Sequence, residues 1–391
     1  MIQAGSLFNQ LLQHFPRTEF AALVRKHDAE RGAKGFTCWA QLVAMLFCQM
    51  AHADSLREIC NGLACSLGKL VHLGIGVAPN KSTLSYANRH RPAALYEDLF
   101  YTALARFRDE QGLGVRKRKF RFKNKLLSLD STTISLCLDL FPWAKFRQAK
   151  GGVKAHVLLD HDDYLPRYVL ITEARRSDVK MADAFPLNPG SIVAMDRGYN
   201  DYALFDQWTE RKIYFVTRLK DNAAYEVLEE GPIPANRNIL SDQLIQFTGE
   251  KAQKDCPSPL RRVAVWDAVN EREIVLLTNL QEFGATTIAA IYKDRWEIEL
   301  FFKALKQNLK VKTFVGTSEN ALRIQIWTAL IAILLLKWLH HLSKAKWSLS
   351  NLASMLRMNL FTYRDLTAWL DNPFGTPPIL PESQQLTLGL M

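Results

Sequence analysis

The sequence predicts a mixed α/β protein, in which a sheet flanked by helices follows an all-α N-terminal domain and contains a small β-rich insertion. Three observations predict this fold class. Apolar residues recur at helical spacing up to about residue 110, short β-branched runs begin at Leu126, and helical spacing returns after Gly284. The 391 residues are too many for one ordinary core, and a composition of 48% hydrophobic and 23% charged residues is typical of a folded chain.

The charge balance favours a polyanionic partner. The chain has 50 Lys and Arg residues against 39 Asp and Glu residues, a net charge of +11, which points to nucleic acid first and to an acidic membrane surface second. The six cysteines form no CxxC pair, so neither zinc nor disulfides are supported. The start of the chain shows no secretory signal, and the apolar run at 326–336 is too short to span a bilayer. We therefore expect a cytoplasmic protein with no membrane partner.

The N-terminal part contains three helical segments, at 8–15, 38–50 and 95–107. Between the last two, a short helix and a Gly-containing turn lead to a second helix, which opens at Asn80 or Ser82 because both are good N-cap residues. That segment carries polar side chains suited to phosphate and base contacts: Lys81, Ser82, Thr83, Ser85, Tyr86, Asn88, Arg89, His90 and Arg91. A DNA-reading helix-turn-helix and a plain solvated helix face both fit this pattern.

A basic run, VRKRKFRFKNK, occupies residues 115–125. Seven of the ten residues from 116 to 125 are basic, and two phenylalanines alternate with basic residues at 120–123. The alternation predicts entry into a strand whose outer face is positive. Such a strand could either keep a sheet edge soluble or contact the backbone of a nucleic acid.

From Leu126 onward the sequence predicts strands and helices in one sheet. Apolar β-branched runs predict strands at 126–138, 154–160, 167–174, 191–199 and 213–219, and helical stretches lie at 179–185 and 202–211. Three strands in succession, followed by alternating strand and helix, indicate a mixed sheet covered by helices. Period-two runs at 261–269 and 272–280, after a Pro-rich stretch, indicate the β-rich insertion.

Three acids occupy positions that favour a metal site. Asp130 lies inside an apolar strand, where a charge is costly unless it is paired, and Asp196 ends another strand immediately before a turn, where ligand sites form. A third acid, Glu299, lies on a later helix and could converge with them. Three oxygen ligands without a nearby His or Cys suit Mg²⁺ or Mn²⁺ rather than zinc. Two such ions about 4 Å apart can promote phosphodiester cleavage.

The helix with Glu299 is predicted to run from Ile291 to Lys310, because this stretch contains no Pro or Gly. Its apolar residues gather on one face that must be buried: Ile291, Ile298, Phe301, Phe302, Leu305 and Leu309. Four polar residues form a stripe along the rim of that face, within roughly 60° of one another: Tyr292, Arg295, Glu299 and Lys306.

Each of these features has a simpler explanation when it is taken alone. Arg295 and Glu299, at i,i+4 spacing, make an ordinary helix ion pair, and a lone strand aspartate is usually a turn former or a salt-bridge partner. Considered together with the basic charge, the order of strand Asp, strand-end Asp and helix Glu is better explained by a metal site.

The order of the acids resembles the DDE transposases, whose catalytic domain has the ribonuclease-H-like fold. Asp130 stands in the segment LDSTT and Asp196 in the segment MDRGY. The helix stripe, with two, three and six residues between its members, resembles the Y-R-E-K signature of the insertion-sequence family-4 group. The segment GGVKAHVLLD, the helical N-terminal part and the β-rich insertion also resemble that group. The resemblance covers most of the chain and is most specific at 126–220 and 287–309.

The resemblance implies a bacterial cut-and-paste transposase. Such an enzyme binds the terminal inverted repeats of an insertion sequence, hydrolyses one DNA strand at each end and joins the freed 3′-hydroxyl to target DNA. Asp130, Asp196 and Glu299 would be the catalytic residues and would hold two Mg²⁺ or Mn²⁺ ions. The partner is then double-stranded DNA, which includes both the transposon ends and the target. A homodimer would bind it. The protein would be cytoplasmic, and associated with the nucleoid when it is bound to DNA.

The resemblance also implies DNA contacts near the cut. Six side chains would make them: Tyr292, Arg295, Lys306, Trp296, Arg197 and Lys154. The first three would touch phosphates, and Trp296 would stack on a base extruded from a hairpin, although a core tryptophan fits the sequence about equally well. For Arg197 and Lys154, a plain ion pair is the alternative.

On this basis we expect five segments in the chain. They are a helical DNA-end-binding domain at 1–115, the first part of a ribonuclease-H-like core at 116–221, the β-rich insertion at 222–283, the second part of the core at 284–346, and a C-terminal helix and tail at 347–391. Two rival functions stay open. One is a metal-dependent DNA nuclease of the same fold without strand transfer, and the other is a non-catalytic DNA-binding repressor.

Overall fold

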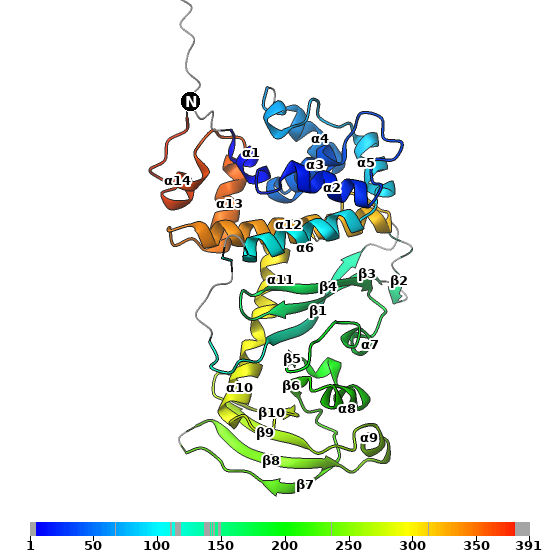
Figure 1. The fold of residues 1–391 in the computed structure, drawn as a ribbon, viewed down its shortest axis with the longest axis vertical. Helices are drawn as coiled ribbons and strands as arrows, with labels where there is room; N and C mark the ends of the chain where they lie inside the picture. The colour runs from blue at the N-terminus through cyan, green and yellow to red at the C-terminus, as the bar shows by residue number, and fades with distance from the viewer. Residues whose placement is uncertain are drawn as a thin grey trace, which may run out of the picture. The chain divides into compact units, whose positions relative to one another are not determined.

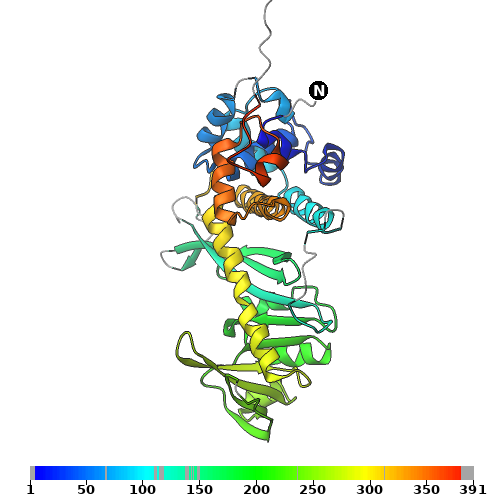
Figure 2. The same ribbon diagram turned by 90° about the vertical axis from the view of Figure 1, so that its left-hand side faces the viewer.

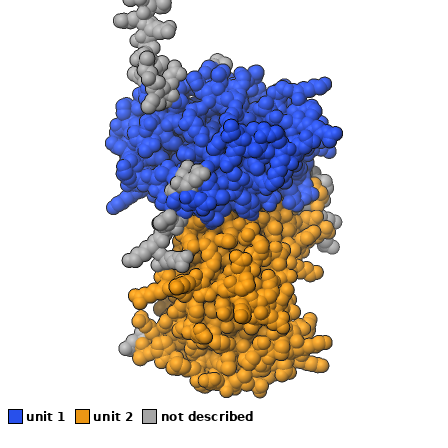
Figure 3. Space-filling view, viewed as in Figure 1, with its two compact units in different colours: residues 1–113, 304–391 blue, residues 114–303 orange. Residues whose placement is uncertain are grey.

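The chain divides into two compact units, which are coloured separately in Figure 3. The computed structural model describes residues 5–66, 68–109, 112–113, 119–136, 141, 143, 145–147, 150–235, 237–311 and 313–379. Unit 1 comprises residues 1–113 and 304–391, and unit 2 comprises residues 114–303. The C-terminal part of the chain therefore shares a unit with the N-terminal part, although all of unit 2 lies between them in the sequence.

Unit 1 is built from helices in the part that the structure describes. They are α1 (Leu7–Leu12), α2 (Arg17–Lys26), α3 (Cys38–Ala51), α4 (Leu56–Ala64), α5 (Lys81–His90), α6 (Ala94–Asp109), α12 (Glu319–Leu342), α13 (Leu349–Asn359) and α14 (Leu366–Asp371). The helical segments predicted at 8–15, 38–50 and 95–107 correspond to α1, α3 and α6. Polar N-caps set several helix starts, such as Thr37 before α3 and Ser348 before α13.

The long helix α12 is the main core element of unit 1. It contacts α3, α5, α6, α13 and α14. It spans 24 residues, more than the predicted apolar run, and by length and composition alone it could cross a membrane. In the structure, however, 89% of its 18-residue apolar window is buried, and Trp338 stacks on Phe107 with 5.3 Å between ring centroids. The helix is thus a buried core helix of unit 1.

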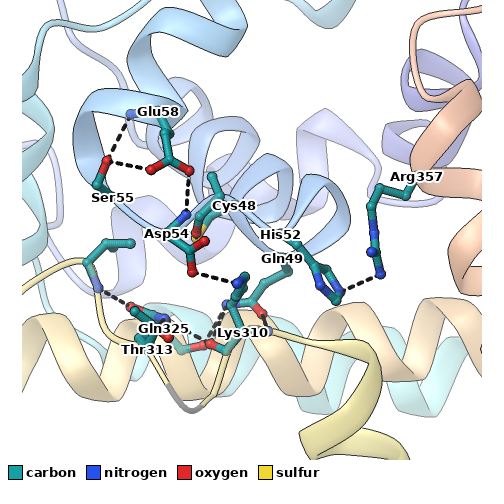
Figure 4. Close-up of polar contacts among 12 residues, drawn as sticks. Cys48, Gln49, His52, Asp54, Ser55, Glu58, Lys310, Thr313, Gln325 and Arg357 are labelled. Atoms are coloured by element: carbon teal, nitrogen blue, oxygen red, sulfur yellow. Dashed lines mark hydrogen bonds and ion pairs between the residues drawn. The ribbon is translucent and has the colours of Figure 1, made fainter.

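A polar cluster holds the chain between α11 (Trp296–Asn308) and α12 (Figure 4). The side-chain amides of Gln49 and Gln325, both fully buried, bond to the backbone N–H and carbonyl of Lys310 at 2.9 and 2.8 Å. The Lys310 ammonium pairs with Asp54 at 2.5 Å. Leaving such a buried amide unpaired would cost about 1–3 kcal/mol, so these bonds fix the segment that follows α11.

Helix α5 begins where the sequence predicts, because Asn80 accepts a hydrogen bond from the backbone N–H of Thr83 at 3.1 Å. Two polar side chains, one in α5 and one directly after it, point into the core rather than outward. Asn88 accepts a hydrogen bond from Gln41 at 2.7 Å, and Arg91 donates one to the same glutamine at 3.1 Å. The expectation that Asn88 and Arg91 face a nucleic acid is therefore wrong, since both satisfy a buried amide.

Unit 2 contains one mixed sheet of ten strands in the described residues (Figure 1). The strands are β1 (Leu126–Leu136), β2 (Lys145–Arg147), β3 (Lys150–Asp160), β4 (Leu165–Glu173), β5 (Ile192–Met195), β6 (Tyr214–Arg218), β7 (Tyr225–Glu230), β8 (Ile239–Phe247), β9 (Leu260–Asp267) and β10 (Arg272–Thr278). β1 pairs antiparallel with β3 and parallel with β5, β3 pairs antiparallel with β4, and β5 pairs parallel with β6. The order β4-β3-β1-β5-β6 is that of a ribonuclease-H-like fold, which confirms the predicted fold class.

The β-rich insertion continues the same sheet. β10 pairs antiparallel with β6, and β9, β8 and β7 follow it in that order. The period-two runs correctly predict β9 and β10. They do not predict β7, because its sequence YEVLEE is exposed at nearly every position, or β8, whose polar residues interrupt the alternation.

Helices cover both faces of the sheet: α7 (Asp178–Ala182), α8 (Tyr202–Glu210), α9 (Glu250–Asp255) and α10 (Ala285–Asp294). One core includes Leu127 and Leu129 of β1 and packs against α8. The other includes Leu126 of β1 and Ala194 of β5 and packs against α10. Neighbouring residues of β1 thus belong to opposite faces, as the pleat requires.

The helix predicted at 291–310 is two helices that follow each other closely, α10 and α11 (yellow in Figure 2). They are separated at Arg295 by a single 3₁₀ turn, in which Arg295 keeps a helical φ of −52° and ψ of −29°, and we call this turn the break. Around the break, backbone bonds span three residues, from the Arg295 N–H to the Tyr292 carbonyl and from the Ile298 N–H to the Arg295 carbonyl. The single-helix prediction is therefore wrong at this turn, and the residue just before it, Asp294, is bound by His161 and Tyr164 from outside the helix. The predicted apolar face is nevertheless buried throughout: Ile291, Ile298, Phe301, Phe302, Leu305 and Leu309.

The basic run does not enter a strand in its described part, residues 119–125. The rings of Phe120 and Phe122 stack with 5.1 Å between centroids, and Phe122 also packs against Phe283. Residues two apart lie on the same side of an extended chain, so the two rings follow the predicted alternation, with Arg121 and Lys123 exposed between and after them. The prediction is wrong in where the strand begins, because β1 starts only at Leu126, after the run. Residues 115–118 lie outside the described residues.

The buried face of α11 generates a stability prediction. We expect Ile298→Ala to lower the free energy of unfolding by about 2–5 kcal/mol, because the fully buried side chain would leave a cavity. Leu300→Ala, on the same helix but 42% exposed, should lower it by less than about 1 kcal/mol. Urea unfolding followed by circular dichroism measures both values, and equal losses would contradict this orientation of the helix.

Candidate active site

Asp130 and Asp196 lie beside each other on adjacent parallel strands. The register of β1 and β5 pairs Leu129 with Met195, and the next residue in each chain segment is an aspartate. Asp196 keeps an extended backbone, with φ −76° and ψ 160°, so the alternation of side chains continues to it. Both carboxylates therefore emerge on the face of the sheet that α10 covers.

Glu299 reaches the same site from α11, and Arg295 links it to the sheet. Arg295 Nη2 lies 2.8 Å from Glu299 Oε1, and Arg295 Nη1 lies 3.6 Å from Asp130 Oδ2. The simpler explanation, an ordinary i,i+4 helix pair, accounts for the first contact but not for the second. The arginine thus joins an acid of the helix to an acid of the strand.

The guanidinium of Arg295 is largely buried and not fully paired. Arg295 is only 9% exposed, and its Cζ lies 5.5 Å from the ring centroid of Tyr292. Its Nε has no hydrogen-bond partner within the described part of the chain. Because a buried donor without a partner is costly, this nitrogen marks a position where an anionic ligand would be stabilised.

Asp130 is under electrostatic strain. Burial raises the pKa of its carboxyl from 3.8 to about 6. The Ser131 N–H, 2.7 Å away, and Arg295 oppose this rise in pKa, whereas the charges of Asp196 and Glu299 add to it. The three carboxylates therefore act on one another's charge and share one neighbourhood.

The donor set of this neighbourhood suits a divalent cation, although its side chains are not arranged around one. Among the described residues, no three His, Cys, Asp or Glu side chains converge as metal ligands. Instead, the single positive charge of Arg295 is shared between Asp130 and Glu299. Carboxylates are hard oxygen donors, and a cation would relieve the strain that raises the Asp130 pKa. The residues present therefore fit Mg²⁺ or Mn²⁺.

Trp296 and Lys306 lie on α11 on either side of Glu299. Trp296 is 57% exposed, which excludes the alternative of a core tryptophan. Lys306 follows Glu299 by seven residues and belongs to unit 1. Because the helix breaks at Arg295, the predicted polar stripe does not run along a single helix.

Arg197 and Lys154 both form ion pairs, which is the alternative that the sequence left open. Arg197 Nη1 lies 3.3 Å from Asp221 Oδ2 at the surface, and Lys154 Nζ lies 3.0 Å from Asp178 Oδ2. A side chain that pairs with a carboxylate can still contact DNA by exchanging partners. The role of both residues as DNA contacts therefore stays a prediction.

Asp178 is a residue of this region that the sequence analysis did not identify. It accepts hydrogen bonds from Ser131 Oγ at 2.8 Å and from Lys154, and it lies 3.4 Å from His156 Nδ1. Since Ser131 follows Asp130, Asp178 supports the strand segment that carries the first acid. In the sequence it looks like any acidic residue in the first turn of a helix.

Comparison with known protein families matches two segments of the chain. Residues 121–335, more than half of the chain, match the family described as Transposase DDE domain. Residues 3–76 match a domain of unknown function, DUF4372. The first match includes Asp130, Asp196 and Glu299, together with the β-rich insertion.

Two individual relatives agree with the family match. The chain is 33% identical over 313 residues to the putative transposase y4zB of Sinorhizobium fredii, covering 79% of this chain and 84% of the relative. It is 34% identical over 235 residues to the probable transposase for insertion sequence element IS5377 of Geobacillus stearothermophilus, covering 60% of this chain and 62% of the relative. Among solved structures, the piggyBac transposase synaptic complex with hairpin DNA aligns with a TM-score of 0.42 and 10% identity, covering 92% of this chain and 80% of that chain.

The raised pKa of Asp130 generates a pH prediction for the metal-free protein. A carboxyl whose pKa is higher in the folded than in the unfolded state makes folding less favourable as the pH rises from about 4 to 6. We therefore expect Asp130→Asn to be more stable than the wild type by about 1–3 kcal/mol at pH 7 in EDTA. The difference should disappear below about pH 4. Urea unfolding across this pH range measures it, and a variant less stable than the wild type at pH 7 would refute the assigned strain.

Proposed function

The chain belongs to the DDE transposase family, and we propose that Asp130, Asp196 and Glu299 are the three acids after which the family is named. As a transposase, the protein is an enzyme that cleaves DNA and transfers the cut strand. The observation that best supports the assignment of the acids is the Arg295 bridge between Asp130 and Glu299. The register that sets Asp196 beside Asp130 supports it further.

Membership of this family implies dependence on a divalent metal ion. We assign two ions, Mg²⁺ or Mn²⁺, to the three carboxylates, because these cations prefer oxygen ligands. When bound, such ions activate a water molecule and stabilise the leaving oxygen of a phosphodiester. The chain's own contribution is to gather the acids, two from adjacent strands and one from a helix.

Arg295 has two alternative sets of partners in this proposal. In the metal-free protein it pairs with both Asp130 and Glu299. Cations at these carboxylates would replace its charge, which would leave the guanidinium and its unpaired Nε free to bind a phosphate of the DNA. The same arginine would then hold the acids together before loading and hold the substrate afterwards.

Five further side chains are assigned to DNA near the cut: Tyr292, Lys306, Trp296, Arg197 and Lys154. Tyr292 contacts the Arg295 guanidinium, and its hydroxyl could reach the same phosphate. The exposed ring of Trp296 could stack on an extruded base. The three basic residues would act as backbone contacts that carry no sequence information.

We propose cut-and-paste transposition at the terminal inverted repeats of an insertion sequence. A water oxygen bonds to phosphorus at the element's end, and the 3′ oxygen leaves and takes a proton. The resulting 3′-hydroxyl bonds to phosphorus in the opposite strand, which forms a hairpin and releases the 3′ oxygen of the flanking DNA as a hydroxyl. Water then bonds to the hairpin phosphorus and releases the 3′-hydroxyl again. This hydroxyl finally bonds to a phosphorus of the target DNA, from which a 3′ oxygen leaves and takes a proton. One relative is named a probable transposase for an insertion sequence element, which supports an insertion sequence as the element that is moved. A homodimer would hold the two ends in one complex.

Helix α5 is our candidate for contact with the inverted repeats. Its outward side chains are polar or basic: Lys81, Ser82, Ser85, Tyr86, Arg89 and His90. Tyr86 is 68% exposed and stacks on His90 with 4.0 Å between ring centroids. The N-terminus of a helix with serine, threonine and lysine side chains suits phosphate, and the exposed base-sized rings suit contacts in a groove.

The assignment of the acids generates the central activity prediction. We expect Asp130→Asn, Asp196→Asn and Glu299→Gln each to slow cleavage of an inverted-repeat end at least about 100-fold, because each removes a charge that the transition state needs. These changes preserve side-chain size, so binding of the uncut end should be largely retained. Gel assays of cleavage and of binding, with Mg²⁺ or Mn²⁺ and with EDTA as the metal-free control, measure both properties.

The same proteins separate the rival functions. With pre-cut ends and a plasmid target, joined products support transposition, whereas cleavage without joined products would favour a nuclease of this fold. If nicking persists unchanged in Asp130→Asn, it does not come from this site. The protein would then be a non-catalytic DNA-binding repressor, and the nicking would come from another source.

The assignment of α5 generates a separate prediction about binding. We expect Arg89→Ala to weaken binding of the inverted-repeat end and to lower the slope of log affinity against log salt by about 1, the loss of one phosphate contact. Arg25→Ala removes the same charge from an exposed position on α2 of the same unit and should change the slope much less. Fluorescence anisotropy over a salt series measures both slopes, and equal effects would remove α5 from the interface.

A further inference from the structure

Three buried side chains of unit 2 form a chain of short hydrogen bonds outside the carboxylate site. Ser128 Oγ lies 2.7 Å from His161 Nε2, and His161 Nδ1 lies 2.6 Å from Asp294 Oδ2. Ser128 belongs to β1, His161 to the turn after β3, and Asp294 is the last residue of α10. We call these three residues the Ser128–His161–Asp294 relay. The sequence analysis did not identify it, because its members are far apart in the chain.

The order of serine, histidine and aspartate is that of a nucleophilic triad, but burial excludes this role. Ser128 is fully buried, and the side chains of His161 and Asp294 are 4% and 2% exposed. A substrate could not reach the serine hydroxyl without displacing part of the sheet or α10. The relay is therefore a connection between elements.

Asp294 is the most strongly held member of the relay. Besides His161, it pairs with Lys119 and accepts a hydrogen bond from the Tyr164 hydroxyl at 3.3 Å. Burial would raise the pKa of Asp294, but His161 and Lys119 outweigh burial and hold the pKa of this carboxyl below its ordinary value. A buried carboxylate with donors on both oxygens is held in one orientation.

Both ends of the relay adjoin the carboxylate site. Ser128 lies two residues before Asp130 on β1, so the two side chains emerge on the same face of the sheet. Asp294 directly precedes Arg295, at the break between α10 and α11. The direction in which the Arg295 side chain leaves the backbone depends on this break, because an uninterrupted helix would rotate it about the axis.

We propose that the relay fixes the helix break and thereby positions Arg295 between Asp130 and Glu299. His161 is then a positioning residue, since it acts through Arg295 and touches neither the acids nor DNA. The catalytic meaning of this arrangement rests on the proposed function of the acids, but the positioning itself does not. Loss of His161 would leave Ser128 and Asp294 without their common partner and allow Arg295 to leave the acids.

A double-mutant cycle in the metal-free protein tests the positioning. His161→Phe, Arg295→Ala and the double variant are unfolded with urea in EDTA. The quantity compared is the decrease in the urea concentration at the midpoint of unfolding. If His161 acts through Arg295, this decrease should be smaller for the double variant than the sum of the decreases for the two single variants. Ser128→Ala, which removes only the far hydroxyl of the relay, takes the place of His161→Phe if that protein does not fold.

A matched control uses a buried hydroxyl on the other face of the sheet. Thr217 of β6 is fully buried and donates to Asn200 at 2.9 Å, and its neighbour Val216 belongs to the core that packs against α10. Thr217 therefore faces away from the relay. Thr217→Val and Arg295→Ala should have additive effects. Additive effects for His161 and Arg295 as well would overturn the proposal.

Single-turnover cleavage of an inverted-repeat end gives a second readout with the same proteins. We expect His161→Phe to slow cleavage about 10- to 100-fold in the wild-type background, and only about twofold in Arg295→Ala. Coupled urea midpoints in a protein that shows no cleavage would support the positioning and count against the proposed function. If the wild type cleaves DNA but His161→Phe slows cleavage by the same factor in the wild type and in Arg295→Ala, the positioning role of His161 would be rejected and the proposed function would stand.

Discussion

The pairing of Arg295 with Asp130 and Glu299 is the interaction on which the rest of the site depends. Two adjacent parallel strands bring Asp130 and Asp196 together, and α11 adds a third negative charge to a poorly hydrated place. Such a group of acids is unfavourable unless a cation compensates it. The guanidinium supplies part of that charge within the chain itself, and we propose that its position depends on the break between α10 and α11.

Most of the fold can be predicted from local sequence pattern, because burial imposes period two on strands and a period near 3.6 on helices. The strands that flank Asp130 and Asp196 are apolar on both faces, and Asn80 and Ser348 mark helix starts. The break at Arg295 has no such local signal. In our proposal its cause is the binding of Asp294, whose partners His161 and Lys119 each lie more than 100 residues earlier in the sequence.

Some residues of the candidate site could likewise be predicted from the sequence, and others could not. Asp130 and Asp196 could be identified because a charge in or at the end of an apolar strand is conspicuous, and Glu299 because of its spacing from Arg295. Asp178 could not be identified, because its partners come from β1 and β3. Asn88 was expected at a nucleic-acid interface, but the buried Gln41 requires a partner, and only the three-dimensional structure reveals that requirement.

The way in which the insertion joins the sheet has a consequence for the evolution of this transposase. Strand β6 would be the last strand of a plain ribonuclease-H-like sheet, and its outer backbone groups would be open to any other extended chain. Here β10 occupies that edge. The insertion is thus not a module that can be lost cleanly. A descendant without it would need another cover for β6, or it would risk pairing with its own copies and aggregating.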